Sequence, residues 1–534
     1  MDKTAWITFR NFNFSYAQEG EPTLRDLNIS LYRGEKLLIL GASGSGKSTF
    51  VRALNNSLGQ APYQGRLEGQ VDRQPVDVVT ITGGMVAAYI NDRQLDLFSQ
   101  NDLVVMMDQL AAKQGLELAG ANKVYVFDEP LSNLSPRMAH QFIDALDDLY
   151  VAKGKTIVIV EHRLEQVMSR HIDRVLVFST GQIVYDGPLV QLFKLHNLIE
   201  FGIREPLYIK ALNYAGYPLN QTHNLTSAKY IFGKNMRQTL ENWVNLIPSM
   251  AKTSKGEELV RLTGVTYQYP DTGRQALKGV DLSIYQGEIV ALVGGNGSGK
   301  TTLAKILHQD LAADQGTYYL DGQPLDHISP SQAHDQGIVY IPQDVNASLG
   351  DDQVRVKDYL QGILDQAGQT SLDQSAFKDI QEVLKVLGLS FAGDMPIYTL
   401  SYGQKHRLLM AGALILNPRL IIMDDPTQGQ DYKHYVELMQ YLTDLNQEYG
   451  MTILINTHDV YVLLQYASRI VVIEAGQIIA DGEAINIVTD PKVVRHSALT
   501  ESSLYLFARQ IGLVDPYGFM RKLLDYDREM QRFM

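Results

Sequence analysis

The chain of 534 residues has no cysteine, no long apolar run and no surplus of positive charge. The lack of cysteine excludes a disulfide scaffold, a thiolate metal site and a cysteine nucleophile, and it fits a reducing cytosol. Purely apolar runs such as residues 289–293 stop near five residues, far below the roughly 20 that a membrane helix needs. The N-terminus lacks the apolar core of a signal peptide. We therefore expect a soluble, cytoplasmic chain that reaches a membrane only through partners.

Charge and length narrow the class further. The 47 Lys and Arg residues face 60 Asp and Glu residues, which gives a net charge of −13 and disfavours a broad nucleic-acid-binding surface. With 45% apolar and 20% charged residues the chain is not mostly disordered. At about 150 residues per domain, its length predicts three to four domains.

Long segments of the chain occur twice. KVYVFDEPLSNLSP, which starts at Lys123, returns as RLIIMDDPTQGQD at Arg419, and RVLVFSTGQIVYDG at Arg174 returns as RIVVIEAGQIIADG at Arg469. A repeat of this length indicates a tandem duplication of one module of about 200 to 270 residues. The expected boundaries are 1–191 and 257–490 for the two modules, 192–256 for an extension and linker, and 491–534 for a C-terminal helical extension.

The numbering offset between the copies shows where they differ. The offset is 253 at the first matched positions, 252 at the middle one and 296 at the last two. The matched pairs are Tyr16 with Tyr269, Lys47 with Lys300, Asn91 with Gln343, Asp128 with Asp424, and His162 with His458. The first copy therefore lacks 44 residues (296 − 252) between positions 91 and 128. In the second copy this interval holds a predicted helix near 374–387 and the segment TLSYGQKHRLLM.

Strand and helix patterns alternate in both copies. The apolar runs LLIL and IVALV each precede a Gly-rich loop and a helix, and VYVF, TIVIV, LIIM and TILI have the composition of further buried strands. This order predicts an α/β fold with a mostly parallel sheet covered by helices. Two predicted hairpins have Gly in the turn. LYIKALNYAG within 192–256 has a helical pattern, and the spacing of Phe519 and Leu523 favours a C-terminal helix docked on its own domain over a partner helix.

Both copies contain the phosphate-binding motif G-x-x-x-x-G-K-[ST]. GASGSGKST spans Gly41–Thr49 and GGNGSGKTT spans Gly294–Thr302, each after an apolar strand and before a helix. Backbone N–H groups of such a loop surround phosphate oxygens, and the lysine reaches the outer phosphates. The alternative is a Gly-rich turn that binds no nucleotide. The expected nucleotide-binding residues are Gly41, Ser43, Gly44, Ser45, Gly46, Lys47, Ser48 and Thr49, and Gly294, Asn296, Gly297, Ser298, Gly299, Lys300, Thr301 and Thr302.

Acidic residues end a buried strand in each copy. We expect Asp128 to lie at a Mg²⁺ ion, together with the Ser48 hydroxyl, and Glu129 to orient the attacking water. In the second copy Asp424 and Thr301 have the metal role. Asp425 replaces the glutamate there and is one methylene shorter, which can cost about 100-fold in rate where positioning matters. A helix N-terminal charge is the alternative role for the acidic pair of the first copy.

Four further residues and one segment fit a nucleotide site. His162 and His458 follow buried strands at the same offset as the acidic pairs, which favours a γ-phosphate contact over a structural role. Tyr16 and Tyr269 are candidates to stack on adenine, although aromatic residues are more often part of a core. In LSYGQ (Leu400–Gln404), Ser401 and Gly403 begin a helical pattern and predict an anion site.

Together these motifs resemble the ATP-binding subunits of ABC transporters, and LNNSLGQAPYQGRLEGQV with EPLYIKALNYAG resembles the tandem ATPases of energy-coupling factor (cobalt and vitamin) importers. The resemblance implies two P-loop ABC domains that pair head to tail, the first lacking most of its helical subdomain. Each ATP then lies between one phosphate loop and the opposite signature. Implied site one comprises Lys47, Ser48, Asp128, Glu129 and His162 with Ser401, Gly403 and Gln404, and Asn91 stands at the Q-loop.

Implied site two comprises Lys300, Thr301, Gln343, Asp424, Asp425 and His458, with Gln343 also a metal ligand. Its opposing signature is missing, because FSQNDLVVMM from Phe98 lacks both glycines of the motif. We therefore expect one consensus and one degenerate ATP site.

The resemblance implies an ATPase that uses ATP and Mg²⁺ to power a membrane importer of a micronutrient: a vitamin, a vitamin precursor or a metal ion. Its partners are then a coupling transmembrane protein and a substrate-binding membrane protein, which hold it on the inner face of the cell membrane. Two alternatives remain: a soluble tandem ABC protein acting on ribosomes or nucleic acid, and a nucleotide-binding regulator. The sequence leaves open the substrate and whether the two halves pair within one chain.

Overall fold

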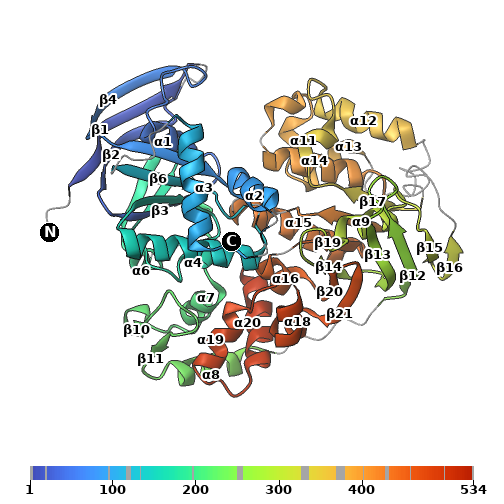
Figure 1. Ribbon diagram of the computed structural model, residues 1–534. Coiled ribbons are helices and arrows are strands. Elements are labelled where there is room, and N and C mark those ends of the chain that lie inside the picture. The colour runs from blue at the N-terminus through green and yellow to red at the C-terminus, as the bar shows by residue number, and fades with distance from the viewer. Residues whose placement is uncertain are drawn as a thin grey trace. The chain divides into compact units, whose positions relative to one another are not determined.

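The structure is a computed structural model. It describes residues 4–17, 21–93, 95, 97–115, 122–132, 134–194, 198–248, 256–325, 336–367, 379–400, 402–426, 432–457, 459–497 and 499–531. The chain forms two compact units (Figure 1). The first comprises Met1–Leu246, Gly429–His434 and Leu506–Val514, and the second comprises Ile247–Gln428, Tyr435–Tyr505 and Asp515–Met534.

A six-stranded sheet forms the centre of the first module. In spatial order its strands are β5 (Asp77–Thr82), β6 (Lys123–Asp128), β7 (Thr156–Val160), β3 (Lys36–Gly41), β8 (Arg174–Ser179) and β9 (Gln182–Gly187). All neighbours are parallel except β8 and β9, which form a hairpin with Gly181 in the turn. Strands β3 and β7 are buried throughout, as expected for continuous apolar runs covered on both faces.

Helices and a second sheet complete the first module. The helices are α1 (Lys47–Leu54), α2 (Gly83–Asp92), α3 (Gln100–Lys113), α4 (Pro136–Lys153), α5 (Leu164–Val167) and α6 (Leu189–Leu192). The second sheet is antiparallel, in the order β2 (Leu24–Tyr32), β1 (Ala5–Tyr16), β4 (Gly65–Arg73). The ring of Phe50 in α1 contacts the rings of Phe9 in β1 and Phe178 in β8. The core therefore joins both sheets through α1.

The second module repeats this plan. Its six-stranded sheet has the order β17 (Ile338–Ile341), β18 (Leu420–Asp424), β19 (Thr452–Asn456), β14 (Ile289–Val293), β20 (Arg469–Glu474), β21 (Gln477–Glu483). The antiparallel sheet has the order β13 (Gln275–Tyr285), β12 (Glu258–Gln268), β15 (Gln315–Leu320), β16 (Gln323–Leu325). Helix α9 (Lys300–Leu307) follows β14, and α15 (Tyr432–Tyr449) precedes β19. The predicted α/β fold with mostly parallel sheets is confirmed in both modules.

The modules differ most between their edge strand and the next strand. In the second module this interval holds α11 (Val345–Leu349), α12 (Val356–Ala367), α13 (Ile380–Val386) and α14 (Tyr402–Leu414), which form one lobe (Figure 1). In the first module only α2 and α3 lie there among the described residues. The expectation that the first copy lacks most of its helical subdomain is confirmed. The predicted helix near 374–387 is present as α13, and residues 374–378 lie outside the described residues.

The connecting and C-terminal segments are folded. The connection holds η1 (Leu198–Phe201), α7 (Leu207–Tyr214), η2 (Leu219–Gln221), the pair β10 (Thr222–His223) and β11 (Phe232–Gly233), and α8 (Met236–Leu246). The C-terminal part holds α16 (Val460–Tyr466), α17 (Ala484–Thr489), α18 (Pro491–His496), α19 (Ser503–Gln510) and α20 (Pro516–Gln531). Helix α20 buries Phe519 and Leu523, and its buried Asp527 accepts a hydrogen bond from Gln465 of α16. No described helix is long and apolar enough to cross a bilayer.

Candidate functional site: two phosphate loops with acidic strand ends

Each phosphate loop joins the central strand of its sheet to a helix that starts at the loop's lysine. Gly46 and Gly299 cap these helices with φ values of 105° and 114°. A side chain is strained at such φ values. A Cβ atom on Gly299 would also lie 2.8 Å from the Ala276 carbonyl oxygen. Glycine is therefore required at both positions, which fixes the direction of the following helix.

The two lysines fold back over their own loops. Lys47 Nζ donates to the carbonyl oxygens of Gly41 and Ala42 at 2.7 and 2.6 Å. Lys300 Nζ donates to those of Gly294 and Gly295 at 2.9 and 3.0 Å. Burial lowers the pKa of Lys300, and the carboxylates of Asp425 and Asp424 partly oppose this shift.

Two loop hydroxyls are buried without a hydrogen-bond partner among the described residues. They belong to Ser45 and Ser298, at matched positions of the two loops. Since a buried hydroxyl is costly when unpaired, both loops have unsatisfied polar groups that fit phosphate oxygens. Both loops therefore satisfy the chemistry of a polyphosphate site.

The two tyrosines lie beside the loops. Tyr16 OH is 3.2 Å from Thr49 Oγ1, and Tyr269 OH is 3.0 Å from Thr302 Oγ1. Tyr16 packs edge-on against Phe14 of β1, and Tyr269 packs edge-on against Tyr267 of β12. These hydrogen bonds hold each ring at the start of the helix that follows the phosphate loop.

In the first module the acidic pair lies at the end of β6. Burial, and next the neighbouring Glu129 carboxylate, raises the pKa of Asp128. Glu129 Oε1 lies 3.0 Å from His162 Nε2, and this hydrogen bond lowers the pKa of Glu129. Asp128, Glu129 and His162 thus come together at one edge of the sheet, because β6 and β7 are parallel neighbours.

In the second module the metal-position carboxylate is held by three side chains. Asp424 Oδ2 accepts hydrogen bonds from Thr301 Oγ1 at 2.9 Å and from the Tyr340 hydroxyl at 3.1 Å. Asp424 Oδ1 accepts one from Asn456 Nδ2 at 3.1 Å. Burial, followed by the Asp424 charge, raises the pKa of Tyr340, so its hydroxyl stays protonated and donates. Asp424 and Thr301 are therefore neighbours, as a shared Mg²⁺ site requires.

The residue that was expected to orient the attacking water has the same unusual backbone conformation in both modules. Glu129 has φ 48° and Asp425 has φ 42°, a left-handed conformation that is uncommon for residues other than glycine. The Glu129 N–H donates to the Val160 carbonyl, and the Asp425 N–H donates to the Asn456 carbonyl, both at 2.9 Å. Such strain is found at functional sites.

The match between Asn91 and Gln343 is wrong. Strand β5 pairs Ile81 with Phe127, and β17 pairs Ile341 with Met423, which is the residue before the acidic pair in each module. This register places Gly83, two residues after Ile81, at the position of Gln343. Asn91 instead lies exposed in the last turn of α2. The spacing of the two copies alone gave the wrong match, because some of the residues missing from the first copy precede β5. Gly83 lies 45 residues before Asp128, and Gln343 lies 81 residues before Asp424. Only 36 residues (81 − 45) are therefore missing after Gly83.

The signature segment begins α14, as predicted. Gly403 and Gln404 lie in its first turn, whereas Ser401 and His458 lie outside the described residues. In the first module α3 has the corresponding place before β6. Its N-cap Ser99 forms a capping box with Asp102: the Ser99 N–H donates to Asp102 Oδ2 at 2.9 Å. The N-terminus of α3 is thus occupied by the chain's own carboxylate.

The sequence interpretation missed several residues at these sites. Tyr340 and Asn456 hold Asp424, and the buried Glu161 accepts hydrogen bonds from the N–H groups of Leu131, His162 and Arg163. Their signal was a mismatch between the copies: Asn456 stands against Val160, and Thr457 against Glu161. Such polar substitutions in matched buried strands mark differences between the two sites.

Comparison with known proteins identifies the family. The ABC transporter family model matches residues 24–135 and 277–428, and a model described as ATP-binding cassette cobalt transporter matches residues 196–267. A putative ABC transporter ATP-binding protein from Enterococcus faecalis is 33% identical over 98% of this chain and 99% of its own. The chain belongs to the ATP-binding proteins of ABC transporters. A similarly described protein from Lactiplantibacillus plantarum is 33% identical, with 98% and 99% covered.

Membership confirms the tandem organisation and the activity. The two ranges of the ABC transporter model fall on the two copies of the duplication. This ABC protein binds ATP and is an ATPase, and it is the ATP-binding subunit of a transporter. The cobalt-transporter model lies over most of the connection between the modules. Among solved structures, CbiO1 from Clostridium perfringens, described as part of the transporter complex CbiONQ, aligns with 45% of this chain and 94% of its own at 29% identity and TM-score 0.39.

Proposed function

We propose that this ABC protein powers a membrane importer of a micronutrient, a vitamin, vitamin precursor or metal ion, with two unequal ATP sites. The match of residues 196–267 to a family described as an ATP-binding cassette cobalt transporter supports this substrate range. The subunit associates with the inner face of the membrane through a coupling transmembrane protein and a substrate-binding membrane protein.

The first site hydrolyses ATP. It has Lys47, the Asp128–Glu129 pair and His162, whose Nε2 lies 3.0 Å from Glu129 Oε1. A carboxylate beside a positioned imidazole is suited to orient a water and take up its proton. Loss of one group that stabilises the transferring phosphoryl group typically costs about 10²–10³ in rate.

The second site retains ATP and turns over slowly. It has a full phosphate loop, but its water-orienting residue is the shorter Asp425. In the first module α3 has the place before β6 that the signature helix has before β18, and Asp102 caps its N-terminus. A carboxylate at a helix N-terminus disfavours the binding of a further anion at that end.

Mg²⁺ fits both sites. Asp424 with Thr301 and Asp128 with Ser48 supply oxygen atoms, which are the ligands that Mg²⁺ prefers, and Gln343 is a further candidate. No cluster of three or more acidic, His or Cys side chains suited to a metal lies among the described residues. Phosphate and water oxygens therefore complete the coordination, as is usual for nucleotide-bound Mg²⁺.

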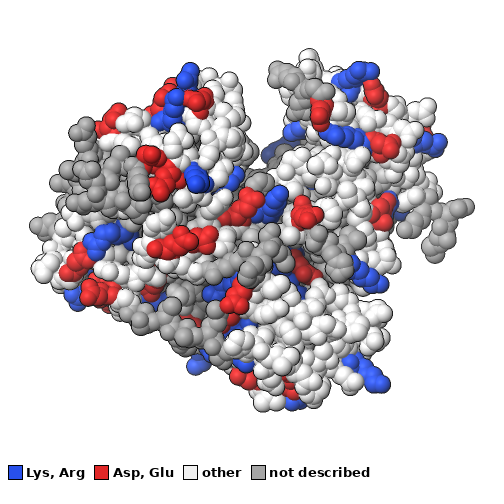
Figure 2. All heavy atoms as spheres, turned by 180° about the vertical axis from the view of Figure 1, so that it is seen from behind, with Lys and Arg blue, Asp and Glu red and all other residues white. Residues whose placement is uncertain are grey.

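The alternative of a ribosome- or nucleic-acid-acting ABC protein has weaker support. On the face of the molecule in Figure 2, described Lys and Arg side chains lie among Asp and Glu side chains, and the net charge is −13. A polyanion-binding surface needs a field of positive sign.

Purification of the native protein from membranes tests the assignment. We expect integral membrane subunits to co-purify and the complex to hydrolyse ATP. Co-purification with ribosomes in their place would overturn the importer assignment. A regulator would show neither membrane subunits nor turnover.

A further inference from the structure

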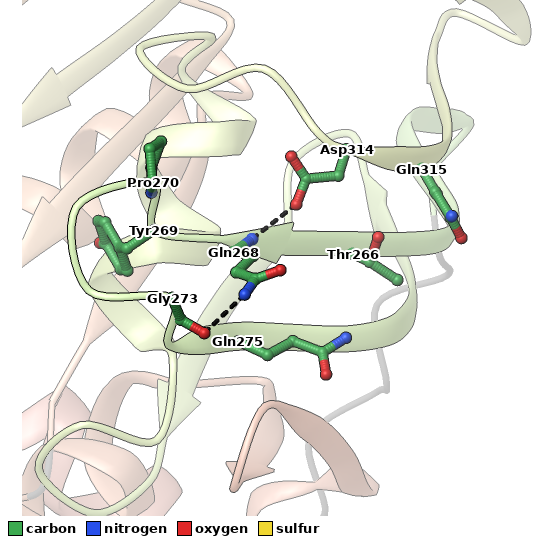
Figure 3. Close-up of a pocket in the computed structure, with 8 residues that line it drawn as sticks. All are labelled: Thr266, Gln268, Tyr269, Pro270, Gly273, Gln275, Asp314 and Gln315. Atoms are coloured by element: carbon green, nitrogen blue, oxygen red, sulfur yellow. Dashed lines mark hydrogen bonds between the residues drawn. The ribbon is translucent and has the colours of Figure 1, made fainter.

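The turn between β12 and β13 in the second module is tightly closed. The Tyr269 N–H donates to the Arg274 carbonyl at 3.0 Å, and the Gly273 N–H donates to the Tyr269 carbonyl at 2.9 Å. Gln268 Nε2 adds a bond of 2.6 Å to the Gly273 carbonyl (Figure 3). Figure 3 also shows the Asp314 carboxylate directed to the Gln268 N–H, which donates to it at 2.6 Å. The positions of Tyr269 and Arg274 are thus fixed by their own backbone.

This turn contacts the phosphate-binding segment at two points. Tyr269 OH reaches Thr302 in α9, as described above, and Arg274 Nη2 donates to the Gly297 carbonyl at 2.5 Å. Gly297 lies in the middle of the phosphate loop and is exposed. Among the described residues Arg274 forms no ion pair, so no carboxylate neutralises its charge. A guanidinium has five N–H donors, and Arg274 uses one of them on the loop.

The first module has the opposite charge at this place. With the offset of 253 that holds for this region, Arg274 corresponds to Glu21. Glu21 forms an ion pair with Arg25 at 2.6 Å, and its side chain is 83% exposed. The arginine close to the first site is instead Arg52 of α1, whose Nη1 donates to Tyr16 OH at 2.6 Å. Among the described residues, only the second module has an arginine of this turn, Arg274, bound to the phosphate loop.

We propose that Arg274 is a nucleotide-binding residue of the second site, where its remaining N–H groups bind phosphate oxygens of ATP. The inference rests on the proposed role of the second loop as a nucleotide site. An anionic polyphosphate supplies the oppositely charged partner that Arg274 lacks within the described chain, and charged hydrogen bonds of this kind are strong. Arg274 thereby slows the release of ATP from the second site, and Glu21 provides no such contact in the first.

The test uses the full chain carrying Lys47→Ala, so that equilibrium binding of ATP reports the second site. In this background we expect Arg274→Gln to weaken ATP binding about tenfold, and Arg274→Lys to weaken it less because the charge is kept. The loss should shrink as salt is raised, since an exposed charge is screened. The matched control is Arg66→Gln, because Arg66 in β4 is also an exposed arginine. This variant should leave ATP binding unchanged.

Two results separate the inference from its premise. If Arg274→Gln binds ATP as tightly as its parent while Lys300→Ala abolishes binding, Arg274 has no role and the inference fails although the second site remains a nucleotide site. If Lys300→Ala in the Lys47→Ala background also binds ATP normally, the second loop is not the nucleotide site and the proposed function fails.

Discussion

The carboxylates at the ends of β6 and β18 occupy matched positions in two copies of one fold, yet their surroundings differ. Asp424 accepts hydrogen bonds from the side chains of Thr301, Tyr340 and Asn456. Asp128 accepts none from the side chains of the described residues, and its pKa is raised by burial and by Glu129.

The difference follows from two strand residues. Asn456 of β19 corresponds to Val160 of β7, and the edge-strand register aligns Tyr340 with Thr80. The three hydrogen bonds fix the orientation of the Asp424 carboxylate, so the second site has a rigidly held ligand group. The first site leaves its carboxylate without such support but adds the Glu129–His162 contact. This difference supports the proposed division between a site that holds ATP and a site that hydrolyses it.

The largest expected effect is on turnover. Glu129→Gln should lower the ATPase rate of the assembled complex by at least about 100-fold, because it removes the group that orients the attacking water. Asp425→Asn is the matched change in the second module and should leave the rate nearly unchanged. Steady-state phosphate release measures both. Equal loss in the two variants would mean that both sites are catalytic and would end the asymmetric comparison.

Low pH should lower the folding stability of the second module through α14, the helix that begins at the signature segment. Burial lowers the pKa of His406 in α14 to about 4, whereas α3 contains no histidine. Because the unfolded state takes up the proton first, stability should fall as the pH drops from about 6.5 to about 4, by about 3 kcal/mol in all.

Urea unfolding at pH 7.5 and pH 5 measures this dependence, and the difference between the native chain and His406→Gln isolates it from other titrating groups. A variant with the same pH dependence as the native chain would exclude His406 as the cause.

An intermediate effect is expected at Glu161. Its carboxylate accepts hydrogen bonds from the N–H groups of Leu131, His162 and Arg163. Glu161 thereby connects the segment after the acidic pair to the segment that holds His162. The matched Thr457 accepts from the Asp459 N–H at 3.2 Å. We expect Glu161→Thr to lower kcat about tenfold with little change in KM, since loss of this link loosens the geometry of His162. Thr457→Ser is the control. A change in KM alone would argue against a positioning role.

The smallest effect is expected from Tyr340→Phe. The variant removes one neutral donor to Asp424 and should cost about 1 kcal/mol of stability, measured by chemical denaturation, without altering ATP turnover. A marked fall in turnover would show that the Asp424 network supports catalysis, and the contrast between holding and hydrolysing sites would need revision.

Much of this molecule was predictable from local patterns. The phosphate loops, the acidic strand ends and the buried strands are contiguous motifs, so the order of residues along the chain is enough to place them. The helical subdomain missing from the first module was visible as a change in offset. The position of Asn91 was predicted wrongly because the whole shortage of the first copy was placed after that point. Strand pairing shows that part of it precedes β5.

Sequence by itself determined the duplication, the α/β class, the two phosphate loops and the substitution of Asp425 for glutamate, because each depends on residues close together in the chain. Tertiary structure alone decided that Gly83 matches Gln343, that Asp102 closes the N-terminus of α3, and that Thr301, Tyr340 and Asn456 meet at Asp424. Those three donors come from a helix and two strands far apart in the sequence. They converge because parallel strands place their carboxyl ends at one edge of the sheet.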